Sequence, residues 1–465
     1  MPVSAIDSLL FKNLFGTEDV RKIFDDKKYI DYCVLVEKNL ADAQAFYELI
    51  PHDAAKEILF QCGKNLDYDK LSQETEVVGY PILPLVTQLA KECGEEAGKY
   101  VHWGATTQDI QDTATMMQMR DALILVEARL KAIIKSLSSL AETYKDAPMA
   151  GRTHLQHALP VTFGYKCAVY LSSFQRHLER LEQLRPRCLL VQFGGAAGTL
   201  ASLGPDTERS LQVRARLARQ LGLEDPPITW HTARDGIAEM INFLALIGGT
   251  LGKVATDLII MSSNEFSEVS EPFILHRGAS STMPQKRNPI SSEVILAASK
   301  MLRANAGLCL DAMLTDFERA SGPWQLEWAA VPESCVLVVG ALSQAEFALS
   351  GLVVNVDATR KNLDSTKGLI VAEAVMMEVA RTIGRQRAHE VGYEACRETI
   401  ESSDRERTLL ATLLEKVEVT EAVDRERLEE LCQTKNYLGA AGAMVDAVLA
   451  LNNTGLEAAR LGIFT

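Results

Sequence analysis

Residues 105–147 read ATTQDIQDTATMMQMRDALILVEARLKAIIKSLSSLAETYKDA, and this stretch of some forty residues contains neither glycine nor proline. Nothing in it interrupts a helix, so the predicted helix is about three times the usual globular length. Apolar residues recur in it at alternating steps of three and four, at Met116, Met119, Leu123, Val126, Leu130, Ile133, Leu137 and Leu140. This heptad pattern predicts a helix that packs lengthwise against others in a bundle.

Other parts of the chain have the same helical character, and alternating β patterns are nearly absent. Long helices are predicted at 165–185, 237–271, 290–306 and 335–352. The predicted fold is therefore all-α. We expect three domains: an N-terminal helical domain (1–111), a central long-helix domain (112–355) and a C-terminal helical domain (356–465). Such long apolar seams also favour a homo-oligomer over a self-contained monomer.

The composition narrows the class of protein. The chain has 465 residues, 47% of them hydrophobic, which is enough for a large folded core. A net charge of −14 argues against a nucleic-acid surface. The nine cysteines are scattered without a CxxC pair, which predicts reduced thiols and no metal site. We find no nucleotide or flavin motif, no uncharged apolar run long enough for a bilayer and no secretory signal, so we expect no cofactor, no membrane partner and a cytoplasmic location.

The first of three polar segments is HWGATTQDIQDT, residues 102–113, at the start of the longest predicted helix. Thr106, Thr107 or Asp109 could cap that helix, and the first helical amides would favour a carboxylate or phosphate. Capping alone is the competing interpretation. His102, taken by itself, is more often a packed residue than a catalyst.

The second polar segment is GRTHLQHALPVTFG, residues 151–164, between two predicted helices. Side chains rich in hydrogen-bond donors and titratable groups crowd into it: Arg152, Thr153, His154, Gln156 and His157. Such a segment suits holding an anion and moving a proton near neutral pH. A hydrogen-bonded turn between helices, with two surface histidines, explains it equally well.

The third polar segment is the loop GASSTMPQKRNP, residues 278–289. A serine hydroxyl is a poor base, so Ser280 could remove a proton only if amides and a cation such as Lys286 stabilised its oxyanion. The alternative is a phosphate-binding or merely flexible loop.

Together the three segments resemble the fumarase/aspartase superfamily, whose signature loop is written GSSxMPxKxNP. The resemblance covers nearly the whole chain. It implies an all-α, three-domain fold and a homotetramer around a core of twenty long helices, with active sites shared between subunits. It also implies proton removal next to a carboxylate, an aci-carboxylate carbanion and a small-molecule carboxylate substrate, without a metal or other cofactor.

The resemblance assigns roles residue by residue. Ser280 matches the catalytic base, Lys286 the residue that stabilises the carbanion, and His154 a general acid, with His157 a second candidate acid. The residues expected to bind substrate are His102, Thr106, Thr107, Asp109, Arg152, Thr153, Gln156, Ser281, Met283, Arg287, Asn288 and Arg319. Ala279 stands where the signature has a second glycine, which implies a less mobile loop.

Within the superfamily the chain is most similar to the 3-carboxy-cis,cis-muconate cycloisomerase branch. The supporting stretches are QFGGAAGTLASLG (192–204), WHTARD (230–235) and NYLG (436–439). The same stretches also resemble fungal trans-aconitate decarboxylase, and both reactions involve an unsaturated tricarboxylate. His154 keeps a C–N lyase that releases fumarate open as an alternative, and a catalytically silent structural relative is a further one.

Overall fold

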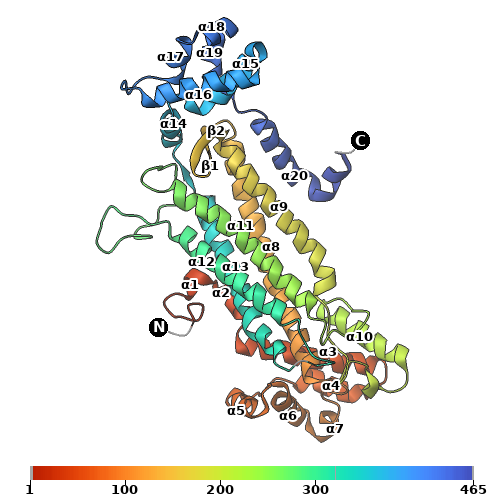
Figure 1. The fold of residues 1–465 in the computed structure, drawn as a ribbon. Coiled ribbons are helices and arrows are strands. Elements are labelled where there is room, and N and C mark those ends of the chain that lie inside the picture. The colour runs from red at the N-terminus through yellow and green to blue at the C-terminus, as the bar shows by residue number, and fades with distance from the viewer. Residues whose placement is uncertain (1–3, 320, 463–465) are drawn as a thin grey trace. The chain divides into compact units, whose positions relative to one another are not determined.

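The computed structural model of the chain describes residues 4–319 and 321–462, and within them twenty α-helices account for most of the structure (Figure 1). This confirms the all-α prediction. The chain divides into two compact units, each made of three segments. The first unit contains residues up to Leu130, His177–Gly252 and Val294–Gln344. The second contains Lys131–Arg176, Lys253–Glu293 and the chain from Ala345 onward.

Five long helices contribute residues to both units. They are α8 (Thr107–Thr143), α9 (Phe163–Cys188), α11 (Asp235–Met261), α12 (Ile290–Asp311) and α13 (Pro323–Ser350). Seven of the eight residues in the predicted seam of α8 are buried, and Leu140 is half-buried. The heptad pattern therefore identified the buried face of this helix.

The first unit also holds shorter helices, mostly from the N-terminal part of the chain. They are α1 (Lys12–Phe15), α2 (Glu18–Ile23), α3 (Asp26–Phe46), α4 (His52–Gln61), α5 (Tyr68–Val78), α6 (Ile82–Glu92), α7 (Gly94–Gly98), α10 (Thr207–Leu221) and the 3-10 helix η1 (Ala201–Leu203). Helix α3 packs against α4 and α10, and α6 packs against α5 and α7.

The second unit contains all the described strands and the C-terminal helices. They are β1 (Pro148–Thr153), β2 (Gln156–Thr162), β3 (Val269–Ser270), β4 (Val353–Val354), α14 (Val356–Asp364), η2 (Leu369–Val371), α15 (Ala372–Ile383), α16 (Arg385–Glu401), α17 (Leu409–Leu414), α18 (Val417–Ala422), α19 (Arg425–Leu431), η3 (Thr434–Asn436) and α20 (Ala441–Gly462). A core of buried apolar residues from α15 to α19 includes Val379, Ala395 and Leu428.

Three predicted elements differ from the structure. The segment after Ala147 is an antiparallel hairpin, β1–β2, rather than a turn between helices. Helix α11 ends at Met261, ten residues before the predicted end, because the polar run that follows forms a turn in which Ser262 bonds back to the Ile259 carbonyl. Helix α13 begins at Pro323, twelve residues before the predicted start, since proline is well suited to the first helical turn.

Two helices, α11 and α13, have the length and hydropathy of a membrane span. In their most apolar windows 50% of α11 and 67% of α13 is buried inside the protein, as expected of core helices. All nine cysteines are free thiols, and seven of them are buried.

Candidate active site

The first polar segment is organised around the buried carboxylate of Asp109. One oxygen accepts hydrogen bonds from the Gly194 amide (3.0 Å) and from His231 Nε2 (2.7 Å). The other accepts from the amides of Thr106 (3.0 Å) and Gly195 (2.9 Å). Asp109 is 1% exposed, and four donors occupy the acceptor positions of its two oxygens. Asp109 therefore positions the start of α8 and the Gly194–Gly195 turn, rather than reaching a substrate itself.

Close backbone approach explains why glycines stand opposite Asp109. A Cβ on Gly194 would lie 2.3 Å from the Thr229 side chain. Gly195 has a positive φ of 76°, and its Cβ would lie 3.0 Å from the Gly104 carbonyl oxygen. A side chain at Gly194 would clash with Thr229, and one at Gly195 would press on the backbone before α8.

His102, just before α8, is paired with a buried carboxylate. Its Nδ1 lies 2.6 Å from Oε1 of Glu37, whose side chain is buried. Burial of the imidazole opposes protonation, but the charge and hydrogen bond of Glu37 outweigh it, and the pKa of His102 is raised. His102 also has a positive φ of 63° and keeps 20% of its side chain exposed, so part of the ring faces solvent.

Arg319 supplies a second cation beside the start of α8. Its guanidinium donates to Thr106 Oγ1 (3.1 Å) and to the Ala196 carbonyl (2.9 Å). Thr107 is the first residue of α8, where unpaired helical amides favour an anion. The first unit thus places His102, Arg319, Thr106 and Thr107 around one helix N-terminus.

The second polar segment is the hairpin, and its tip carries His154. Thr153 pairs with Gln156, so the turn consists of His154 and Leu155 alone. Both residues have positive φ (52° and 60°) and both are exposed. A two-residue turn of this kind favours Asn-Gly, so a His-Leu turn costs conformational energy and points to a functional reason for the histidine.

The hairpin also contains Arg152 and His157, which face each other across the strands. Arg152 makes a bidentate ion pair with the buried Glu268 (3.0 and 2.6 Å) and lies 4.5 Å from the centre of the Phe266 ring. Burial, together with the positive charge of Arg152, lowers the pKa of His157. His157 is therefore neutral near pH 7, while Arg152 is engaged by Glu268 and orders the hairpin.

The third polar segment, drawn in green after α11, is an irregular loop closed at its base (Figure 1). The Asn288 amide donates to the Gly278 carbonyl (2.9 Å), and a Cβ on Gly278 would lie 2.3 Å from the Asn288 carbonyl oxygen. Gly278 also has a φ of 72°, so this position requires glycine. Ala279 pairs with Arg287 across the same base.

Ser280 sits inside this loop with its hydroxyl oxygen held by two amides. Its Oγ accepts from the backbone N–H groups of Thr282 (3.2 Å) and Met283 (3.1 Å). These donors would stabilise an oxyanion at Oγ, as proton transfer by a serine requires. Residues 281–287 of the loop are exposed, including the side chains of Ser281, Met283 and Lys286.

Glu271 anchors the loop to the start of α12. Its buried carboxylate accepts from the amides of Ser291 (3.2 Å) and Ser292 (2.8 Å) and from the Ser292 hydroxyl (2.8 Å). Arg287 donates to the Glu271 carbonyl and lies 5.2 Å from the centre of the Phe273 ring. Arg287 therefore acts here as a brace for the loop.

The predicted residues lie at the start of α8 in the first unit, and in the hairpin and the serine loop of the second unit. Sequence reasoning missed Glu37, His231 and Glu268, whose partners lie far away along the chain. The Gly-Gly pair at 194–195 and the stretch WHTARD, which contains His231, stand out in the sequence, but no structural role was predicted for them. In the described part of the chain, no three His, Cys, Asp or Glu side chains gather closely enough to hold a metal ion.

Comparison with known proteins adds independent information. Residues 14–302 match the family described as "Lyase", and residues 368–448 match the "Adenylosuccinate lyase C-terminus". The chain is 46% identical over 439 residues to trans-aconitate decarboxylase 1 of Mycosarcoma maydis, covering 94% of this chain and 88% of that protein.

Two further relatives are similar over nearly their whole length. The 3-carboxy-cis,cis-muconate cycloisomerase of Pseudomonas aeruginosa is 41% identical over 446 residues, covering 95% of this chain and 96% of that protein. A crystal structure of a fumarate lyase from Mesorhizobium sp. BNC1 superposes with a TM-score of 0.87 at 50% identity, covering 94% of this chain and 98% of that one.

Proposed function

Because the chain belongs to the fumarase/aspartase superfamily of lyases and is an enzyme of that group, we propose that it acts on an unsaturated tricarboxylate by transferring a proton at a carbon next to a carboxylate. The observation that supports this proposal is that the Ser280 hydroxyl oxygen, in an exposed loop, accepts hydrogen bonds from two backbone amides. Those amides stabilise the serine oxyanion that remains when the proton has left.

The charges around the start of α8 suit a substrate with several carboxylates. Glu37 raises the pKa of His102, which favours the cationic form of the imidazole, and Arg319 is held by Thr106 and Ala196. In the serine loop Lys286 supplies a further cation, which we assign to the carboxylate of the carbanion. An acidic chain that gathers cations only locally selects a small anion rather than a polyanion.

Two reactions fit this arrangement. In a cycloisomerisation like that of 3-carboxy-cis,cis-muconate cycloisomerase, a substrate carboxylate oxygen bonds to one carbon of a double bond. The electron pair then forms a carbanion on the next carbon, which takes a proton from Ser280 or His154. The 41% identity to the Pseudomonas aeruginosa enzyme supports this reaction.

In a decarboxylation like that of trans-aconitate decarboxylase, a carbon–carbon bond breaks, CO2 leaves and the carbanion takes a proton. The 46% identity to the Mycosarcoma maydis enzyme favours this second reaction. Both reactions use the same acid and the same carbanion-stabilising groups, so the proposal is the shared proton transfer at a tricarboxylate.

Matched substrate pairs test the substrate class. We expect turnover of 3-carboxy-cis,cis-muconate to a lactone or of trans-aconitate to itaconate, followed by 1H NMR, and little turnover of cis,cis-muconate or fumarate, which lack the third carboxylate. Release of fumarate from adenylosuccinate or argininosuccinate, with both tricarboxylates untouched, would overturn the proposal in favour of a C–N lyase. Complete inactivity towards all six would favour the silent structural relative.

We further propose a homotetramer with active sites shared between subunits, located in the cytoplasm. Large apolar side chains are exposed on four of the long helices: Ile124, Val169, Leu246 and Leu310. Half of the most apolar window of α11 is not buried within one chain. Burying these surfaces against other copies would remove apolar area from water.

Mixing two inactive variants tests the shared site. Ser280→Ala and His154→Ala, unfolded together and refolded, should regain part of the wild-type activity, because some sites then receive both intact segments from different chains. Light scattering should give the mass of four chains. A monomeric mass, or a mixture as inactive as either variant alone, would contradict this proposal.

A further inference from the structure

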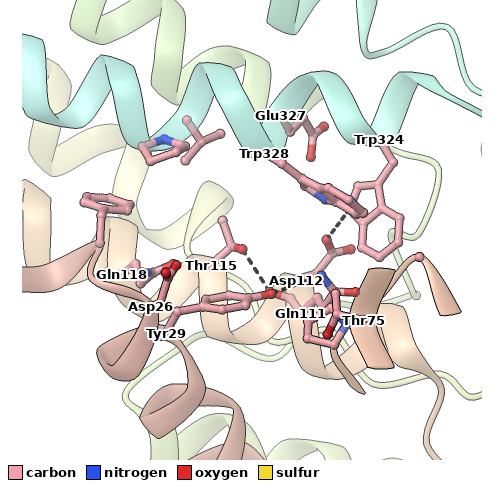
Figure 2. A pocket seen from close by; sticks show the side chains of 15 residues that line it. Asp26, Tyr29, Thr75, Gln111, Asp112, Thr115, Gln118, Trp324, Glu327 and Trp328 are labelled. Carbon is pink, nitrogen blue, oxygen red and sulfur yellow. Dashed lines mark hydrogen bonds between the residues drawn. The ribbon is translucent and has the colours of Figure 1, made fainter. Parts of the chain in front are cut away.

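A cavity of about 330 Å³ opens in the first unit between α3, α8 and α13 (Figure 2). Its volume is at the lower end of the range for small-molecule sites. Phe24, Asp26 and Tyr29 line it from the N-terminal region, and further residues come from α8 and α13. None of the residues that carry the proposed proton transfer lines this cavity.

Aromatic rings form one wall of the cavity. Trp324 and Trp328 line it, with their ring centres 5.2 Å apart in an edge-to-face arrangement. Tyr80 stacks on Trp324 with a centre distance of 5.9 Å and meets Trp328 edge-on at 6.0 Å. Trp328 remains 40% exposed, so an aromatic surface is open to a ligand. The faces of such rings attract cations.

A buried polar atom on the opposite wall lacks a partner. Gln111 is 5% exposed, and its Nε2 donates to the Tyr29 hydroxyl (3.1 Å), but its Oε1 has no hydrogen-bond partner. Figure 2 places the Gln111 side chain beside Tyr29 at the cavity. A buried carbonyl oxygen without a hydrogen-bond partner lowers the stability of the folded state. A ligand that donates a hydrogen bond to this oxygen would remove that cost.

The charge of the cavity wall is negative. Asp112 and Glu327 share one cation, because the buried Arg234 bonds to both carboxylates. Two carboxylates against one guanidinium leave a formal charge of −1, and Asp26 adds a third carboxylate at the mouth. No lysine, arginine or histidine is among the described residues that line the cavity. Burial is the main cause that raises the pKa of Glu327, and the hydrogen bond and charge of Arg234 oppose it.

We propose that this cavity binds a small organic ammonium ion, with its apolar part against Trp324 and Trp328 and an N–H group donated to Gln111 Oε1. The aromatic wall, the unpartnered acceptor and the uncompensated carboxylate each favour such a ligand. An anionic substrate of the proposed reaction would meet only repulsion here. The cavity is therefore a site for a second molecule of opposite charge.

Three probes of similar size distinguish the contributions: n-butylammonium, tetramethylammonium and neutral 1-butanol, titrated calorimetrically into the full chain at constant ionic strength. We expect n-butylammonium to bind at least about tenfold more tightly than 1-butanol, since only the ion gains the charge and aromatic attraction. Tetramethylammonium should bind more weakly than n-butylammonium because it has no N–H group for Gln111. Equal affinity for the alcohol, or no saturable binding of either ion, would overturn the proposal.

Variants locate the binding. Trp328→Leu, Asp26→Asn and Gln111→Leu should each weaken n-butylammonium binding at least about fivefold, whereas Asp53→Asn, on the exposed side of α4, should not. Trp328 and Asp26 are exposed, so these two variants keep the test valid even if Gln111→Leu fails to fold. Unchanged affinity in those two would place the ammonium site elsewhere and overturn the assignment.

Discussion

The segment around Asp109 and the loop around Ser280 are both polar interruptions of a helical protein, but they are built in opposite ways. Asp109 is 1% exposed and has four protein donors. The serine loop is largely exposed, and the side chain of Ser280 accepts its hydrogen bonds from two backbone amides of the loop itself. In the first segment the carboxylate of Asp109 is fully used in hydrogen bonds within the protein. In the second segment the side chains are exposed and can contact a substrate.

This difference indicates that the two segments have different roles, one in binding and one in proton transfer. A buried, saturated carboxylate fixes the start of α8 and the glycine turn, so that anion-binding groups are already in place when a substrate arrives. An exposed loop can move towards a bound substrate and carry the acid or base with it. Variants in the loop should therefore change rate without stability, and variants around Asp109 should change both.

The largest expected effect is that of Ser280→Ala on the rate. Loss of the proton-transferring hydroxyl should lower kcat about a thousandfold, with the melting temperature unchanged because Ser280 lies in an exposed loop. Steady-state kinetics and thermal melting measure the two effects. Ser72→Ala, an exposed serine on α5, is the control and should match wild type in both. A large fall in melting temperature for Ser280→Ala would break the comparison.

Asp109→Ala should have the next largest effect, this time on stability. Removing the carboxylate leaves four buried donors without their acceptor, which should cost about 3 kcal/mol of unfolding free energy. Chemical denaturation measures it, with Asp53→Ala on the exposed side of α4 as the control. A cost near zero would mean that Asp109 is not the organising group of the segment.

Glu37→Gln tests the binding role of the first segment through the pH dependence of kcat/KM. The pKa of His102 is raised, which favours the cationic imidazole proposed to bind the substrate, so kcat/KM should fall as pH rises through that pKa. In the variant, burial lowers the pKa of His102, so the fall in kcat/KM should move to lower pH. Between the two transitions, kcat/KM of the variant should be about tenfold below that of wild type. The exposed Glu76→Gln should leave the profile unmoved, and an unshifted profile in Glu37→Gln would contradict the role of this pair.

The same pair carries a stability effect whose sign follows from linkage. A histidine whose pKa is raised by folding stabilises the protein fully below its unfolded pKa. That contribution is lost as pH rises through the folded pKa. Wild type should therefore exceed Glu37→Gln in melting temperature at acidic pH, with the gap narrowing as pH rises through the folded pKa.

The smallest expected effect separates two strained neighbours in the hairpin. Leu155 is 67% exposed with a positive φ, so Leu155→Gly should stabilise the protein by about 0.5 kcal/mol and leave the rate nearly unchanged. His154→Gly should give a similar stability change but lower kcat. Equal kinetics in the two variants would show that the turn serves structure alone.

Much of the fold was predictable because its signals are local. The absence of glycine and proline from 105 to 147 gave a helix within a few residues of α8, and the heptad pattern gave its buried face. The hairpin was missed because its turn is His-Leu rather than the usual Asn-Gly, so the local signal was weak. The early start of α13 was marked by Pro323, a helix-start signal that the prediction passed over.

The candidate site was predictable in its residue types but not in its pairings. The polar loop composition pointed to Ser280, and a requirement for amide donors followed from the chemistry of serine. The partners of His102, Asp109 and Arg152 could not be inferred, because Glu37, His231 and Glu268 lie 65, 122 and 116 residues away. Long-range pairing of this kind is set by the tertiary fold and leaves no local pattern.

One measurement tests the central claim most directly: 1H and 2H NMR of the reaction in D2O with 3-carboxy-cis,cis-muconate and trans-aconitate. The account predicts that wild type forms a product with one deuterium on a carbon next to a carboxylate, and that Ser280→Ala forms it about a thousandfold more slowly. A product that carries no deuterium, or an equal rate of deuterium transfer by Ser280→Ala, would contradict the assignment of proton transfer to Ser280.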